Sequence, residues 1–574
     1  MVDLNKYAAV QDVDAMSNVV YRSGSNGGKG DTLDQVAESG LDLKSVDETP
    51  SIKHHSMAIN GKSIDYTASA GHLIAWTPRD PAHPDKKDAR ASIFYEAYTR
   101  DDVPVAKRPV TFLFNGGPGS PSIWLHMNSW GPKFLKVDAP YPINSADMPA
   151  SFPLVDNAET LLDQTDLVFI DVPGAGFSEA ILPYKNVDLW NTNVDADIFR
   201  DFITAYINRN NRQSSPKYIY GESYSGIRAP IVANRLLQAG TSNYATDSSG
   251  GKPIILSGVI LNSPVLDYSF ASTPVIENSS RGSRHSSSPS GNLTIPVNAS
   301  VELGLFPTIG MVFHHNNVQK NGWTTSTAEY ADYLRKFSSE VIRRVELHPA
   351  SMNEHNVSET AGILGLTKIG NIEWGNIESH VKQVMLNLNN SKATFIGLYP
   401  AINYTYDEEE KYFTVEQLSL DSYDARINTL NRLNYDLGSY LNAGNFGVIK
   451  PFLFDHLNYK IPDDQIYGAG AAFEKWDWSV PHRNSVLPSS LGDLAEILLL
   501  EPSIKVFVFH GYHDLVTPFY QTELDLMHAG LWSPERDGKP VSMRNYDGGH
   551  MVYLTTNSRK PLRDDLRKFY DHQL

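Results

Sequence analysis

The chain has 574 residues, of which 41% are hydrophobic and 20% are charged, with a formal net charge of −17 and no cysteine. This ordinary globular composition excludes wholesale disorder, a collagen-like rod and a coiled coil. The acidic excess argues against a nucleic-acid partner, and the absence of cysteine excludes disulfides, thiolate metal sites and a cysteine nucleophile.

The first segment, residues 1–50, is rich in Gly, Ser and Asp and is expected to form a loosely ordered leader. Its start, Met1–Met16, has neither the basic nor the apolar region of a signal peptide. The longest apolar stretch, Ile254–Leu266, is too short to span a bilayer. We therefore expect no membrane span and a mature secreted or periplasmic chain, with a cytoplasmic location as the alternative.

Short strands are predicted from residue 66 onward. Each is a compact run of β-branched or aromatic residues that ends at a small or polar turn, and a helical pattern often follows. Buried strands that alternate with helices predict a mostly parallel central sheet flanked by helices, which is the α/β class. The predicted strands are Tyr66–Trp76, Ser92–Tyr98, Pro109–Phe114, Leu167–Val172, Lys217–Tyr220, Ile254–Leu261 and Lys505–Phe509.

The strand pattern lapses between residues 268 and 490, where helical patterns such as Ala328–Val345 and Ile377–Leu388 replace it. An insertion between two strands of one sheet is expected to cover the carboxyl edge of the strands, where α/β proteins bind ligands. Although the length alone suggests about four domains, the pattern favours one interrupted core. The predicted division is a leader at 1–50, core at 51–267, a large, mainly helical cap at 268–490 and core again at 491–574.

A glycine turn, Asn115–Ser120, directly follows the strand Pro109–Phe114. Its adjacent glycines allow the backbone to direct N–H groups toward one point, as stabilisation of an oxyanion requires. The turn lacks the Gly-Lys-Ser/Thr ending of a phosphate loop. On this segment alone, an ordinary tight turn is the alternative.

The most informative segment joins the strand Lys217–Tyr220 to a helical pattern through Gly221-Glu222-Ser223-Tyr224. A serine on a sharp turn between strand and helix is typical of a hydrolase nucleophile. The fifth position of the usual G-x-S-x-G pattern holds Ser225, so the motif is incomplete. A serine that caps the helix is therefore an alternative interpretation.

Two later turns provide candidate partners for this serine. Asp514 follows a predicted strand and could orient an imidazole, or it could form an Asx turn. His550 follows a flexible turn near the end of the chain, and His513 is a competing histidine. The order Ser223, Asp514, His550 is the nucleophile, acid and base order of α/β-hydrolases.

Together these segments resemble the serine carboxypeptidase family, peptidase S10, which has an α/β-hydrolase fold. The chain lacks cysteine and has several local features, including Trp476-Asp477-Trp478, that are similar to those of a bacterial-type branch of that family. The matching stretches are Asn115–Ser120, Asp171–Ser178, Gly221–Gly226, Gly511–Asp514 and Gly549–Val552.

The resemblance implies a role for each candidate residue. Ser223 would be the nucleophile, His550 the general base and acid, and Asp514 its orienter. The backbone N–H groups of Gly117 and Tyr224 would form the oxyanion hole.

The resemblance also implies a site for the terminal carboxylate of the substrate, formed by Asn115, Gly116 and Glu222. A carboxyl group can donate a hydrogen bond to a carboxylate only while one of the two is protonated, so acidic pH should favour binding. No metal and no cofactor are implied. The pairs His54-His55 and His314-His315 are expected to be surface features, because no third ligand stands at a recognisable spacing.

Three positions depart from the family pattern. Ser129 replaces a second Glu that often precedes a Gly-Pro pair. Tyr512 replaces an acidic residue shortly before Asp514. Tyr553 stands where Pro is common after the His-Met-Val sequence. None of these departures removes a member of the triad, but the first argues against an unmodified carboxylate site and leaves the specificity open.

The sequence therefore predicts a serine carboxypeptidase that releases C-terminal residues from peptides through an acyl-enzyme. An esterase, amidase or acyltransferase that acts on a small acyl or amide substrate is the first alternative, and a catalytically inactive binding protein is the second. Neither the preferred terminal residue nor the oligomeric state follows from the sequence.

Overall fold

The computed structural model describes most of the predicted core and parts of the predicted cap. The described ranges are 33–78, 86–136, 153–268, 298–315, 326–343, 354–363, 403–407, 412–416, 418–420, 428–430, 437–461, 467–468, 470, 472–479 and 487–574. The predicted helix Ile377–Leu388 and residues 1–32 of the predicted leader lie outside these ranges.

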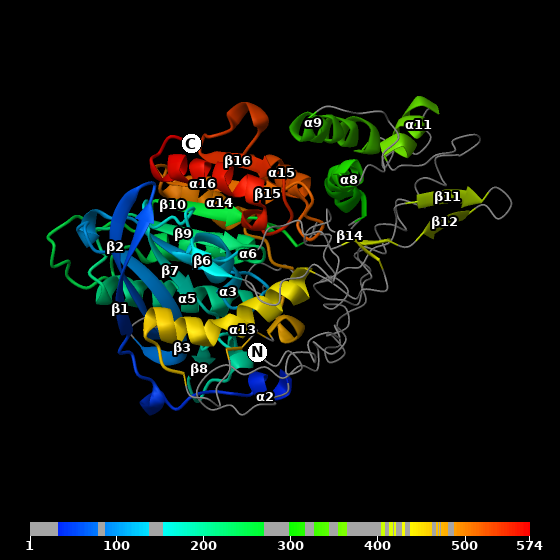
Figure 1. The fold of residues 1–574 in the computed structure, drawn as a ribbon. Helices are drawn as coiled ribbons and strands as arrows, with labels where there is room; N and C mark the ends of the chain where they lie inside the picture. The colour runs from blue at the N-terminus through cyan, green and yellow to red at the C-terminus, as the bar shows by residue number, and fades with distance from the viewer. Residues whose placement is uncertain are drawn as a thin grey trace.

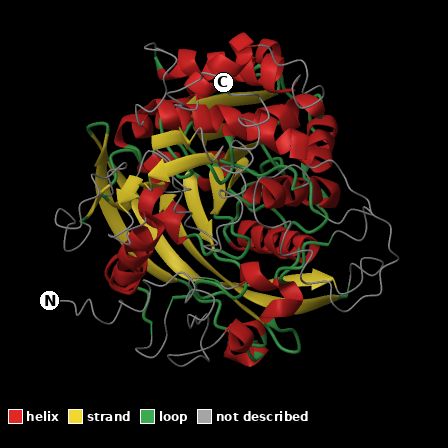
Figure 2. Ribbon diagram, turned by 90° about the vertical axis from the view of Figure 1, so that its right-hand side faces the viewer, coloured by secondary structure: helices red, strands yellow, loops and turns green. Residues whose placement is uncertain are grey.

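A ten-stranded mixed sheet forms the centre of the molecule (Figures 1 and 2). Its first three strands and β8 pair antiparallel, whereas the strands from β7 to β16 run parallel to one another. This confirms the predicted α/β-hydrolase fold, with an antiparallel edge added to the parallel part. The strand order is β1 (Ser51–Ile59), β2 (Lys62–Pro78), β3 (Lys87–Arg100), β7 (Asp166–Ile170), β4 (Val110–Phe114), β9 (Lys217–Glu222), β10 (Gly258–Asn262), β15 (Lys505–Gly511) and β16 (Val541–Tyr546), and β8 (Glu179–Ala180) pairs with β3.

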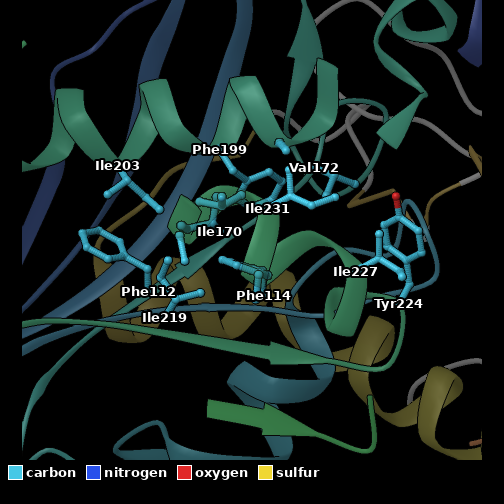
Figure 3. Packing of buried hydrophobic residues seen from close by; sticks show 14 of the residues in the cluster. Phe112, Phe114, Ile170, Val172, Phe199, Ile203, Ile219, Tyr224, Ile227 and Ile231 are labelled. Atoms are coloured by element: carbon cyan, nitrogen blue, oxygen red, sulfur yellow. The ribbon is translucent and has the colours of Figure 1, made fainter. Parts of the chain in front are cut away.

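The parallel strands are apolar on both faces because helices cover both faces. In β4, Phe112 and Phe114 belong to one hydrophobic cluster and Leu113 to the other. Figure 3 shows Phe199 and Ile203 of one covering helix pointing toward the sheet residues. The first face is covered by α5 (Thr192–Arg209), α6 (Ser225–Ala239), α14 (Leu491–Leu500) and α15 (Phe519–His528), and the second by α3 (Ile123–Leu125), α13 (Leu437–Leu457) and α16 (Thr556–Tyr570).

The described part of residues 268–490 contains helices and two small antiparallel strand pairs. The predicted helix Ala328–Val345 is present as α9 with a π-helical end, η6. The division into core and cap stays a prediction. The elements of this segment, besides α13, are α8 (Asn298–His315), α9 (Thr327–Phe337), η6 (Ser338–Ile342), α11 (Glu354–Ile363), β11 (Asn403–Asp407), β12 (Tyr412–Glu416), β13 (Leu418–Leu420), β14 (Asn428–Leu430) and η9 (Ala472–Lys475).

The described end of the predicted leader packs on the core. Residues Leu33–Ala37 form the short helix α2, in which Val36 and Ala37 are buried within the first hydrophobic cluster. Leu41 is also buried and pairs with Ile181 next to β8. Residues 33–50 therefore differ from the loosely attached segment that their composition suggests, because these few apolar side chains reach the core.

The remaining elements are short turns and an outlying strand pair. They are η3 (Leu43–Ser45), η4 (Val105–Lys107), the π-helical turn η5 (His126–Trp130), β5 (Lys133–Leu135), β6 (Leu154–Asp156), α4 (Asn186–Leu189), η11 (Pro534–Arg536) and η12 (Val552–Leu554).

Candidate active site

Ser223 lies on the sharp turn between β9 and α6. Its backbone adopts a left-handed conformation with φ of 61°, which is unusual for a residue other than glycine and is typical of strained functional positions. Its N–H donates to the carbonyl of Asn262 (3.0 Å), and its carbonyl accepts from Val265 N–H (3.1 Å). Helix α6 is preceded by Tyr224 without a side-chain capping bond, so Ser223 does not cap it.

Asp514 and His550 meet at the same carboxyl edge of the sheet. Asp514 follows β15, His550 follows β16, and both side chains are buried. The Nδ1 atom of His550 donates to Oδ2 of Asp514 at 2.8 Å. The competing histidine, His513, lies instead 3.5 Å from Asp547. The structure therefore pairs Asp514 with the histidine that the chain order predicts.

Asp514 also forms the turn that was the alternative interpretation. Its Oδ1 atom accepts from the N–H groups of Val516 (2.9 Å) and Thr517 (3.0 Å), which is an Asx turn. The Thr517 hydroxyl donates to Oδ2 at 2.5 Å and lies 3.1 Å from His550 Nδ1. One carboxylate oxygen thus fixes the turn while the other faces the imidazole.

The surroundings of His550 favour its charged form. Burial alone would lower the pKa of this imidazole, but the charge and hydrogen bond of Asp514, and then the charge of Glu222, raise it above its usual value. An imidazole whose cation is stabilised in this way is suited to accept the proton of a serine hydroxyl.

A connection of four residues, Asn262–Val265, ties the serine turn to His550. The hydroxyl of Ser263 donates to the carbonyl of His550 at 2.7 Å, and its N–H donates to Phe509 of β15 (2.8 Å). The ends of β9, β10, β15 and β16 are therefore linked, and the three triad candidates lie at one edge of the sheet.

The glycine turn lies directly against the serine turn. A Cβ atom on Gly116 would come within 2.5 Å of Tyr224 N and 2.8 Å of Ser223 Cβ, and Gly117 has a φ of 101°. Among the residues that the structure describes, neither Gly117 N–H nor Tyr224 N–H donates a hydrogen bond. Both donors are therefore available to an oxyanion, and the oxyanion hole stays a prediction.

A buried arginine contacts both of these turns, and it was not predicted from the sequence. Arg228 on α6 forms an ion pair with Asp195 (2.6 Å) and donates to the carbonyl of Asn115 (2.7 Å) and to Ser225 Oγ (2.9 Å). Ser225 Oγ itself donates to Asn115 O (2.8 Å). The serine at the fifth motif position thus holds the glycine turn through a contact that glycine could not make.

The predicted carboxylate-binding residues form a buried acid–amide cluster. Oε1 of Glu222 accepts from Asn115 Nδ2 at 2.6 Å, and Oε2 accepts from Asn262 Nδ2 at 2.5 Å. Leu125 N–H donates to Asn115 Oδ1 (3.0 Å), which directs the amide nitrogen toward Glu222. Sequence reasoning missed Asn262, because nothing in its local pattern shows that β10 ends beside Glu222.

Burial raises the pKa of the Glu222 carboxyl to about 7, although the charge of His550 and interactions with Tyr553, Asn262 and Asn115 act in the opposite direction. The carboxyl group is therefore largely neutral under mildly acidic conditions. A neutral carboxyl beside the candidate nucleophile can donate a hydrogen bond to a carboxylate.

The three departures from the family pattern are accommodated differently. Ser129 is buried in η5, and its hydroxyl donates to Leu125 O within its own helical segment. Tyr512 packs edge to face on Phe519, with ring centroids 5.4 Å apart. Tyr553 is buried in η12, and its hydroxyl lies beside Glu222 and Asn115.

The described ranges contain no group of three His, Asp or Glu side chains placed to hold a metal ion. In the same ranges, the helices are too short or too polar to cross a membrane.

The model of a family described as serine carboxypeptidase matches residues 70–423. This range includes Ser223 and the glycine turn and ends before Asp514. The protein "Serine carboxypeptidase-like 4" of Arabidopsis thaliana is 22% identical over 369 residues, which cover 62% of this chain and 71% of that protein. "Serine carboxypeptidase-like 3" of the same plant is 28% identical over 167 residues, which cover 28% of this chain and 34% of that protein.

The solved structure of Kex1(delta)p, a prohormone-processing carboxypeptidase from Saccharomyces cerevisiae, is also similar. It has a TM-score of 0.48 and 15% sequence identity, with 88% of this chain and 91% of that chain covered.

Proposed function

The chain belongs to the serine carboxypeptidase family of hydrolases, and we propose that it releases C-terminal residues from peptides through an acyl-enzyme on Ser223. The observation that carries this proposal is the buried Glu222–Asn115 cluster next to the serine turn. A triad of serine, histidine and aspartate catalyses many kinds of acyl transfer. A neutral acid beside the serine, in contrast, selects a substrate that ends in a carboxylate.

In the proposed reaction, Ser223 Oγ attacks the last peptide carbonyl while His550 accepts its proton. Asp514 holds the imidazole through Nδ1 and stabilises the cation that forms. The N–H groups of Gly117 and Tyr224 donate to the oxyanion of the tetrahedral intermediate. His550 then protonates the leaving amine, and a water molecule activated by the same histidine hydrolyses the acyl-enzyme.

Glu222 binds the other end of the leaving residue. Its protonated carboxyl, together with the Asn115 amide, donates hydrogen bonds to the terminal carboxylate. The Asn115 amide belongs to the turn that holds Gly117, so carboxylate binding and oxyanion stabilisation are coupled through one short segment. In the proposed complex, this binding brings the last peptide carbonyl, which belongs to the penultimate residue, to Ser223, and internal peptide bonds are not reached.

The variant Ser223→Ala tests this assignment. We expect it to lower kcat on N-blocked dipeptides by about 10⁴-fold or more, because the covalent step is lost. A fluorophosphonate should label the wild type and not the variant, because only an activated serine reacts rapidly. Unlabelled, inactive wild type would favour the binding-protein alternative, and full activity of Ser223→Ala would contradict the proposed nucleophile.

A further inference from the structure

Tyr553 is placed rigidly between the His550 turn and the η5 segment. Its side chain is fully buried, and its ring lies 6.5 Å from that of Trp130 at an angle of 65°. Its carbonyl accepts from Arg559 Nη1 (3.0 Å), which also donates to the carbonyl of Asn128 (3.0 Å). These contacts fix both the backbone and the ring, so the direction of the hydroxyl is determined by the fold.

The hydroxyl of Tyr553 lies at the carboxylate-binding cluster. It lies beside Glu222 and Asn115. It interacts with the Glu222 carboxyl, but it makes no hydrogen bond of normal length and angle with any residue that the structure describes. A buried hydroxyl without a well-formed hydrogen bond can donate to an acceptor that a ligand supplies.

The neighbouring groups do not need this hydroxyl. Each oxygen of Glu222 already accepts from an asparagine amide, one from Asn115 and the other from Asn262. The hydroxyl of Ser129, at the position where the family often has a second acid, is bonded to Leu125 O in its own segment. Glu222 therefore keeps both amide hydrogen bonds when the Tyr553 hydroxyl donates to a ligand.

We propose that Tyr553 is a substrate-binding residue whose hydroxyl donates a hydrogen bond to the C-terminal carboxylate of the peptide. This inference rests on the proposed carboxypeptidase function and adds a third side chain to Glu222 and Asn115. Tyr553 thereby supplies a neutral donor in a cluster where Ser129 supplies none.

A tyrosine and a glutamic acid differ as carboxylate ligands. Burial, followed by the charge of Glu222 and a hydrogen-bonding interaction with it, raises the pKa of Tyr553 well above its usual value. The hydroxyl therefore stays protonated and remains a donor at every pH at which Glu222 titrates. Because of Tyr553, the enzyme should retain part of its affinity for a free carboxylate after Glu222 has ionised.

The conservative variant Tyr553→Phe removes this donor and keeps the ring. For N-blocked dipeptides with a free C-terminus, we expect KM to rise roughly 10- to 100-fold, since a hydrogen bond to a charged group is lost. The kcat value and the KM for the matching dipeptide amides should change little. The melting temperature should be nearly unchanged, because the hydroxyl makes no well-formed hydrogen bond in the described structure.

Tyr570→Phe is the matched control. Tyr570 is a buried tyrosine on α16 whose hydroxyl is bonded to Thr111 Oγ1 (2.8 Å), near the amino end of β4 and away from the site. It should leave both KM values unchanged. If Tyr553→Phe does not fold, Tyr553→Leu provides the same comparison of acids with amides.

An unchanged KM for the free acids, or an equal rise for acids and amides, would overturn the role of Tyr553. If the proposed carboxypeptidase function is wrong, the result is different, because the wild type would then hydrolyse the free acids and the amides equally well.

Discussion

At the scale of single residues, the site depends most on Glu222. Its carboxyl is buried at the end of β9, accepts from two amides, and has a pKa of about 7. A free glutamate titrates near pH 4.3, so this group changes charge in a range where an unperturbed acid would not. The affinity for a terminal carboxylate should therefore change with pH in the same range.

We predict that KM for free-acid substrates is constant at acidic pH and rises up to about tenfold per pH unit above about pH 7, where Glu222 loses its proton. Glu222→Gln keeps a donor but cannot ionise, so its KM should not show this rise. Steady-state kinetics between about pH 5 and pH 8 measures both profiles. A rise of the same size in the variant would contradict the assignment.

The same carboxyl links folding stability to pH. Because the folded-state pKa of Glu222 is raised, its contribution to stability is complete below the unfolded value near pH 4.3 and is lost as pH rises through about 7. Glu222 and His550 also influence each other, so apparent pKa values from the kinetics belong to the pair.

The residues of the proposed site differ in how clearly the sequence predicts their roles. Ser223 and Asp514 each follow a predicted strand, so the common edge of a parallel sheet was enough to predict that they lie near each other. His550 was predicted from its turn and from the order of the three residues along the chain. Thr517 and Tyr553 carry no such signal, because their importance arises from which side chains they face. The role of Arg228 could not be predicted either, since an arginine in a helical pattern is usually exposed.

At the scale of elements, a salt bridge joins α9 to α15, which is the helix that follows the Asp514 turn. Arg335 of α9 donates to both carboxylate oxygens of Glu523 (2.8 and 2.7 Å) and lies over the ring of Phe519. Asn545 donates to the same carboxylate (2.9 Å). Tyr512, the second departure from the family pattern, packs on Phe519 beside this ion pair.

We predict that Arg335→Met lowers the free energy of unfolding by about 3 kcal/mol, because Glu523 stays buried without its counter-charge. The double variant Arg335→Met/Glu523→Gln should recover part of that loss, since the uncompensated charge is removed. Denaturant unfolding measures both.

Lys560→Met is the control for this experiment, because it removes an exposed pair with Asp564 and should cost less than about 1 kcal/mol. A similar loss in Arg335→Met and Lys560→Met would show that α9 is not held by this contact.

At the scale of the whole molecule, two distant parts of the chain complete one sheet and bring together the residues of the proposed site. β9, which precedes Ser223, and β15, which precedes Asp514, are both neighbours of β10, although the predicted cap separates them in the sequence. The regular succession of buried strands made this sheet predictable. The antiparallel β1 was not predicted, because its alternating polar residues resemble those of an exposed loop.

The segment between β10 and β15 was much less predictable. Its helices do not alternate with strands of the main sheet, so no rule of sheet topology fixes their order or their neighbours. The contact of α9 with α15 includes an ion pair and a cation–π contact between residues far apart in the sequence. The pocket for the substrate side chain is expected in this segment, and for the same reason residue preference does not follow from the sequence.

The most direct test of the proposed function compares kcat/KM for an N-blocked dipeptide with that for its C-terminal amide at about pH 6, where Glu222 is protonated. We predict at least a tenfold preference for the free acid and release of its last residue, because Glu222 and Asn115 bind only the free carboxylate well. Equal rates for acid and amide would contradict carboxylate recognition and would favour an esterase, amidase or acyltransferase.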